Sequence, residues 1–213
     1  MIYRKPSLDD PIRQGDIFRN IPRVDFSLSS LPVIDNGGAH QANWRDILSD
    51  IAHSEPITAV LSMQPVYGIV ITQNCDTVRG EFICLCQVDD FLTAINQKQS
   101  PPKNVKAWQS LIVRLARTNL RWFYLPPDSE MGIVDRMAAD FRVVLRIPRI
   151  DLENMQDLRI ASLNDIAAEH FRETLGQFFR RYAYNEWYPL DREEFQSYGQ
   201  GSPEQVEPYP WQK

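Results

Sequence analysis

The sequence predicts an α+β fold, consisting of a small β-barrel with helical insertions and a long helix near the C-terminal end. Two observations support this. Short apolar runs of strand-like composition recur between residues 57 and 147, and two longer segments repeat apolar residues at the helical period. The 213 residues are 43% hydrophobic and 11% aromatic, so the chain holds enough apolar surface for one packed domain.

The predicted barrel begins at a glycine turn. Gln14-Gly15-Asp16 leads into a strand that runs from Ile17 to Phe26 and is interrupted at Pro22, because proline cannot donate to a β-ladder. Further apolar runs predict the core strands. These are Ala59–Leu61, Tyr67–Thr72 and Phe82–Cys86, followed by Arg121–Leu125 and Phe141–Ile147.

Helices are predicted in both insertions and at the end of the domain. Residues 44–51 and 103–119 place apolar side chains on one stripe, and the first of these segments follows a Gly-containing loop at 35–38. The last helix starts near Ser162, with Asp165 three residues on, and presents a broad apolar face as far as Tyr182. We expect one domain over residues 1–184, insertions at 27–56 and 89–127, and an acidic tail rich in proline and aromatic residues over 185–213.

Composition also predicts the compartment. No apolar run approaches the roughly 20 residues needed to span a bilayer, and the basic N-terminal residues Arg4 and Lys5 precede no apolar stretch of the kind found in secretory signals. The three cysteines are odd in number, which is a poor basis for a disulfide framework and fits a reducing environment. We therefore expect a cytoplasmic protein without a membrane-spanning part.

The strongest site candidate is the polar motif Thr72-Gln73-Asn74-Cys75-Asp76, which directly follows a buried strand. Polar side chains at such a strand end are held in place by the sheet, and binding and catalytic groups commonly lie there. We take Cys75, Asp76 and Arg79 as candidate catalytic residues. Gln73 and Asn74 are candidate binding residues.

Three interpretations of the cysteines remain open. Cys75 is a nucleophile or redox thiol if a base or cation such as Arg79 lowers its pKa. Alternatively, Cys75, Cys84 and Cys86 bind zinc together with His40, His53 or His170, although their spacing matches no recognised zinc knuckle. In the third interpretation the polar residues form turn hydrogen bonds and the cysteines pack as small apolar side chains. We assign no metal or cofactor on this basis.

Charge is distributed unevenly along the chain. The formal net charge is −5, yet residues 91–127 contain no Asp or Glu and six Lys or Arg residues. Spacing near the helical period places Arg114, Arg117 and Arg121 on one face close to Trp122, a combination of cations and rings that suits single-stranded nucleic acid. The simpler alternative is a solvated helix face. The candidate RNA- or partner-binding residues here are Lys103, Lys106, Arg114, Arg117, Arg121 and Trp122.

The order of these motifs resembles that of the PemK/MazF-type toxin barrels. The resemblance rests on Gln14–Phe18, on Gly68–Thr72, on Phe82–Val88 and on Val134–Ile150, which leads through Arg159–Leu163 into a helix. The motif at residues 72–76 is also similar to a Ser/Thr-Gln-x-Cys-Asp motif of uncharacterised bacterial and phage-associated proteins. The first resemblance covers about half of the chain.

The resemblance implies an SH3-like barrel, frequently dimeric, that cuts single-stranded RNA without a metal. In that family, activity depends on an arginine in the loop before the central strand and on a Thr or Ser that ends the next strand. The corresponding loop, Leu61–Tyr67, contains no arginine here, and the next strand ends at Cys86-Gln87.

The sequence therefore predicts a non-catalytic or weakly catalytic interaction module that binds RNA or a protein partner. The resemblance further suggests a homodimer and a role in a toxin–antitoxin or phage-defence system. One alternative is a divergent metal-independent endoribonuclease in which Arg79 or Arg121 replaces the missing arginine. The other is an enzyme that depends on Cys75, or a zinc site.

Overall fold

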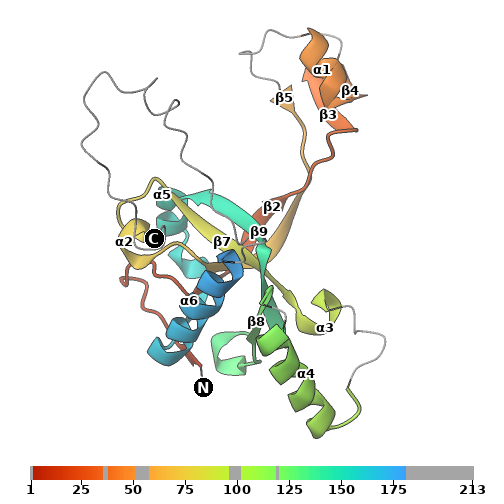
Figure 1. Cartoon of the computed structure of the whole chain (residues 1–213). Helices are drawn as coiled ribbons and strands as arrows, with labels where there is room; N and C mark the ends of the chain where they lie inside the picture. The colour runs from red at the N-terminus through yellow and green to blue at the C-terminus, as the bar shows by residue number, and fades with distance from the viewer. Residues whose placement is uncertain (1, 36–37, 51–57, 96–101, 119, 181–213) are drawn as a thin grey trace, which may run out of the picture. The chain divides into compact units, whose positions relative to one another are not determined.

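The computed structural model describes residues 2–35, 38–50, 58–95, 102–118 and 120–180. The chain divides into two compact units, residues 1–178 and 179–213. The first unit contains the main sheet (Figure 1). Among the described residues, no helix is long and apolar enough to cross a membrane.

A seven-stranded sheet organises this unit. Its strands follow the order β1-β10-β2-β6-β7-β9-β8, and every neighbouring pair is antiparallel. The strands are β1 (Tyr3–Arg4), β2 (Asp16–Val24), β6 (Met63–Val70), β7 (Phe82–Asp90), β8 (Trp122–Leu125), β9 (Met137–Pro148) and β10 (Arg159–Leu163).

Helix α6 (Asp165–Phe179) covers one face of the sheet. Asn164 caps its start, because the Asn164 side chain accepts a hydrogen bond from the backbone N–H of Ala167 at 2.9 Å. Phe171 is fully buried beneath the helix, with its ring centroid 5.0 Å from that of Phe123 and 5.6 Å from that of Phe141. The burial of Phe171 contributes roughly 1.5–3 kcal/mol to folding, so this face is the main apolar core.

The opposite face carries a second core. Helix α5 (Arg149–Asn154) supplies Leu152, which is fully buried with Phe18 and Leu85, and the short 3-10 helix η2 (Gln156–Leu158) packs Leu158 against them. Gly68 allows these strands to approach, because a Cβ at that position would lie only 3.1 Å from a methyl group of Leu85. The helix-covered parts of both faces are therefore closely packed.

A third cluster joins the end of the sheet to α3 (Phe91–Ala94) and α4 (Val105–Thr118). Phe91, Trp108 and Tyr124 meet edge to face, with ring centroids 4.9–6.0 Å apart. Such aromatic pairs stabilise a fold beyond the area that they bury. The remaining short helices, α2 (Asn74–Thr77) and η1 (Ser129–Met131), follow strands β6 and β8.

The first predicted insertion has its own small sheet. Strands β3 (Leu31–Asp35), β4 (Gly38–Ala42) and β5 (Thr58–Ala59) pair in the order β4-β3-β5, and α1 (Trp44–Asp50) follows β4. The insertion leaves the main sheet after the β2–β6 pair Val24 and Met63. The helix was predicted. The expectation that Ala59–Leu61 is a barrel strand was wrong, because β5 pairs with β3.

The mixed α+β class is confirmed, and the predicted strands at residues 67–72, 82–86, 121–125 and 141–147 all contribute to the main sheet. No closed barrel is found, because no ladder joins edge strands β1 and β8 among the described residues. The sheet nevertheless curls until these edges approach, and the Tyr3 hydroxyl donates to the Pro126 carbonyl at 2.7 Å. A cavity of about 440 Å³ opens at this seam, between Ile2, Phe123 and the first turns of α6.

Candidate functional site

The Gln73–Asp76 motif forms a tight turn at the end of β6. The Thr72 hydroxyl accepts a hydrogen bond from the Cys84 N–H at 2.8 Å, which joins the turn to β7. The single-turn helix α2 follows and ends where the Gly80 N–H donates to the Asp76 carbonyl at 2.7 Å. A side chain at Gly80 would meet that carbonyl at 2.8 Å. The turn therefore depends on glycine.

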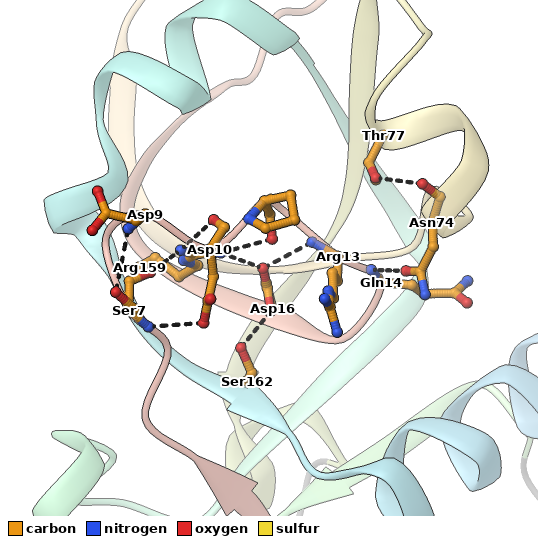
Figure 2. Close-up of polar contacts among 11 residues, drawn as sticks. Ser7, Asp9, Asp10, Arg13, Gln14, Asp16, Asn74, Thr77, Arg159 and Ser162 are labelled. Carbon is orange, nitrogen blue, oxygen red and sulfur yellow. Dashed lines mark hydrogen bonds and ion pairs between the residues drawn. The ribbon is translucent and has the colours of Figure 1, made fainter.

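A second sequence motif holds this turn from the side. The backbone N–H of Gln14 donates to Asn74 Oδ1 at 2.9 Å, and Gln14 Nε2 donates to the Ile71 carbonyl at 2.7 Å. Gly15 has a φ of 90°, a conformation that glycine adopts without strain. Figure 2 shows Gln14 and Asn74 side by side. The two motifs singled out from the sequence thus meet in space, although about 60 residues separate them.

Behind the turn lies a buried ion pair (Figure 2). Arg159 Nη1 lies 2.9 Å from Asp16 Oδ2, and both side chains are at most 2% exposed. Asp16 also accepts hydrogen bonds from the Ser162 hydroxyl and the Arg13 N–H. The Arg159 guanidinium donates to the backbone carbonyls of Ser7, Asp10 and Pro11. This network fixes the loop before β2, so the strand-end turn rests on a rigid base.

The candidate catalytic side chains themselves are exposed. Cys75 Sγ lies 3.9 Å from Gln73 Oε1, and no hydrogen bond or ion pair joins Cys75 to a described His, Lys or Arg residue. Asp76 is exposed, and so is Arg79, whose backbone N–H donates to the Asp76 carbonyl. The turn thus presents a thiol, an amide and a carboxylate to solvent, and no described base or cation forms a hydrogen bond or ion pair with the thiol.

The other two cysteines lie along β7. Cys84 is half-buried, whereas Cys86 is buried in the main core, and burial raises the pKa of Cys86 to about 12. Within the described ranges, no group of three or more His, Cys, Asp or Glu side chains is placed to hold a metal ion. Of the imidazoles proposed as ligands, His53 lies outside the described residues. His40 and His170 belong to different elements, β4 and α6.

The basic segment is arranged differently from the sequence expectation. Lys103, Lys106 and Arg114 are exposed on or beside α4, whereas the side chain of Arg117 lies outside the described residues. The expected common face with Arg121 and Trp122 is absent, because α4 ends at Thr118 and both residues belong to the β8 segment. Trp122 is only 6% exposed and packs in the third core.

Arg121 instead belongs to a polar network on the face of the sheet opposite α6. Its Nη2 lies 2.6 Å from Asp140 Oδ2, and its Nε donates to both Asp140 oxygens. The Arg142 guanidinium contacts the same carboxylate at 3.4 Å. Asp140 therefore holds two guanidinium groups. We call the side chains of Arg23, Gln87, Arg121, Asp140 and Arg142 the arginine network.

The network continues across the sheet to β2. Gln87 on β7 is the register partner of Asp140 on β9, and Gln87 Oε1 accepts a hydrogen bond from Arg23 Nη1 at 2.7 Å. Gln87 and Asp140 are buried. Burial raises the pKa of Asp140, and the hydrogen bond and charge of Arg121 act against that rise. Arginines from three parts of the chain thus converge on two buried polar groups.

Sequence reasoning identified only Arg121 from this network. The available signal was a polar residue inside an apolar strand, since Gln87 follows Leu85-Cys86 and Asp140 follows Ala138-Ala139. A buried polar side chain needs a partner, so both positions pointed to further polar residues nearby. The identity of Arg23 and Arg142 as those partners depends on strand register, which the sequence alone does not provide.

Neither the models of protein families nor the curated proteins match this chain.

Proposed function

We propose that this protein is a non-catalytic interaction module, built on an opened PemK/MazF-like barrel, that binds a protein partner through its first insertion and the adjoining ends of β2 and β6. One observation carries the proposal. Of the eighteen exposed large apolar side chains among the described residues, nine fall between residues 24 and 63. We call these nine the insertion surface. They are Val24, Phe26, Leu28, Ile34, Trp44, Leu48, Val60, Leu61 and Met63.

The insertion cannot bury this surface by itself. Its sheet has three short strands and one helix, and only Leu31 and Val33 among its described large apolar side chains are buried. Phe26 is 63% exposed and Met63 is 66% exposed. These nine side chains belong to one stretch of the chain, and exposed apolar side chains that gather on one part of a protein mark interaction surfaces. A partner's apolar surface would supply the missing layer.

The barrel part of the proposal is supported by the curl of the main sheet, which brings β1 and β8 together at the Tyr3–Pro126 hydrogen bond. The non-catalytic part is supported by the loop before β6, where the resemblance expects an arginine and none is present. The role in a toxin–antitoxin or phage-defence system remains a prediction of the resemblance.

Photo-crosslinking tests the proposal. Phe26 is replaced by a photoreactive phenylalanine analogue in the full-length protein, and crosslinked proteins are identified from host cells by mass spectrometry. We expect one dominant partner, which is lost when Leu28 and Met63 are changed to Ser. The matched control is Val134→Ser, a change at an apolar residue that is 75% exposed outside the insertion.

Two results would contradict the proposal. One is the same set of partners with the Leu28→Ser/Met63→Ser protein as with the unchanged protein. The other is an equal loss of the crosslinked partner in the Val134→Ser control protein. Crosslinking to a second copy of the chain, together with a dimer in analytical ultracentrifugation, would identify the partner as the protein itself.

The Cys75 alternative has a separate test. Rapid labelling of Cys75 by a maleimide at neutral pH, much faster than for a free thiol in a peptide, is the expected property of an activated nucleophile. Because no described cation forms a hydrogen bond or ion pair with Cys75, we expect labelling at the rate of an ordinary exposed thiol. Accelerated labelling would favour the enzyme over the interaction module.

A further inference from the structure

The arginine network presents its positive charges to solvent and hides the central negative one. The Asp140 side chain is 3% exposed, whereas the side chains of Arg121 and Arg142 are 27% and 54% exposed. Arg23 is 29% exposed. One buried carboxylate therefore orients two guanidinium groups, and their outward atoms form the surface. An anion approaching this face meets cations that are already in place.

Arg142 has an unused donor group. Its Nε and Nη2 contact Asp140 at 3.4 Å, a long distance for a charged hydrogen bond. No described residue accepts a hydrogen bond from its Nη1. Arg23 contributes a further cation whose only acidic partner among the described residues is Asp25, itself 59% exposed. Such an exposed ion pair contributes little, so a stronger acceptor can displace Asp25.

Register brings the guanidinium groups close to one another. Gln87 and Asp140 are directly opposed on neighbouring strands, so their Cβ atoms lie about 5 Å apart. Arg23 binds the first of these side chains, and Arg142 contacts the second. The planar fork of arginine matches the oxygens of a phosphate group. Arg121 adds a flat cation stacked over the Trp122 ring, with 4.1 Å between its Cζ atom and the ring centroid.

We propose that Arg23, Arg121 and Arg142 form a phosphate-binding site on the sheet, with Asp140 and Gln87 as positioning residues. The ligand is a phosphate group carried either by single-stranded RNA or by a free nucleotide. The site uses no residue of the insertion surface. It is therefore a second binding activity, and its failure would leave the proposed protein partner unaffected.

Fluorescence anisotropy tests the site. Full-length protein is titrated at low salt, without added metal, against a labelled single-stranded RNA oligonucleotide, and adenosine monophosphate is then added as a competitor. We expect saturable binding that Arg142→Ala weakens at least roughly tenfold, the loss expected for a charge-assisted hydrogen bond. The matched control is Arg172→Ala, a change at an exposed arginine of α6, which covers the other face.

The competitor distinguishes the two sources of phosphate. Displacement of RNA by equimolar adenosine monophosphate assigns the site to a nucleotide. The site is assigned to a nucleic-acid backbone if adenosine monophosphate does not displace the RNA and if Arg142→Ala reduces the slope of log affinity against log salt concentration by about one. No binding of either probe, or equal losses with Arg142→Ala and Arg172→Ala, would overturn the proposal.

The Asp140→Asn variant tests whether Asp140 orients the arginine side chains or only neutralises their charge. If Asp140 only neutralised its neighbours, its replacement would remove a negative charge and strengthen phosphate binding. If Asp140 orients the two guanidinium groups, the same change weakens binding, and this is the result we expect. Circular dichroism establishes that each variant is folded, and stronger binding by a folded Asp140→Asn protein would contradict the positioning role.

Discussion

Asp16 and Arg159 form the ion pair in which a single substitution has the largest expected effect. Both side chains are almost completely buried, so Asp16→Ala leaves an uncompensated guanidinium in the interior. Breaking such a pair costs about 3–5 kcal/mol, and we expect a loss of that size in the free energy of unfolding measured in urea. The control is Asp9→Ala at an exposed carboxylate in the same loop. Equal stability of the two variants would show that the pair is unimportant.

The Cys86 thiol makes stability depend on alkaline pH. Burial raises the pKa of the Cys86 thiol from its usual value of 9.0 to about 12. A raised pKa means that the protonated thiol is favoured in the folded protein. Its contribution to stability is complete below pH 9 and is lost as the pH rises towards 12. We expect the free energy of unfolding to fall from pH 8 to pH 10.5, and to fall less in Cys86→Ala. Parallel curves for the two proteins would contradict this.

At the scale of elements, the sequence predicted the parts of the chain that have a clear hydrophobic period. Helices α4 and α6 and strands β6 and β7 lie where apolar spacing placed them, because each buries one face or both. Strands β3 and β4 were missed. β3 alternates buried Leu31 and Val33 with Pro32, a residue that disfavours a strand, and β4 is almost entirely exposed, so neither shows a clear apolar run in the sequence.

The candidate sites also differ in how clearly the local sequence marks them. The polar residues of the strand-end turn are consecutive in the sequence and follow an apolar run, so they could be identified in advance. The arginine network draws on residues between 23 and 142, from β2, β7, β9 and the segment before β8. Its assembly depends on the register shift in β9, and nothing in a local sequence window encodes such a shift.

Excision of the insertion tests whether the main sheet is independent of it. None of the described residues between 25 and 62 belongs to the three buried clusters of the sheet, and Val24 pairs directly with Met63. Joining these two residues through Asn-Gly, which favours a two-residue hairpin turn, should preserve the fold. We expect a cooperative urea transition with a similar midpoint. Loss of cooperativity would show that the insertion stabilises the sheet.

At the scale of the whole molecule, the curl of the sheet depends on contacts between its two edges. The Tyr3 hydroxyl bonds to the Pro126 carbonyl across the seam, and burial raises the pKa of Tyr3. Tyr3→Phe removes this hydrogen bond, and we expect a loss of about 0.5–1.5 kcal/mol. Hydrogen exchange should become faster in β1 and β8 and remain unchanged in β7.

Tyr67→Phe is the control for that change, because Tyr67 is half-buried and no described residue hydrogen-bonds to its hydroxyl. If Tyr3→Phe and Tyr67→Phe had the same exchange rates throughout the sheet, the edges would be held together by apolar packing alone. Faster exchange at β1 and β8 only in Tyr3→Phe would identify the hydroxyl as the connection between them.

The register shift in β9 links the shape of the sheet to its charge. The partner on β9 changes from Val144 to Asp140 between Cys86 and Gln87, and residues 141–143 have no partner on β7. The Asp140 carboxylate accepts the Arg142 N–H within this gap. Deletion of residues 141–143 would remove this bend together with Arg142, one of the two guanidinium groups that Asp140 holds. Among related sequences, the length of this strand and the arginines at its bend should therefore be inherited or lost together.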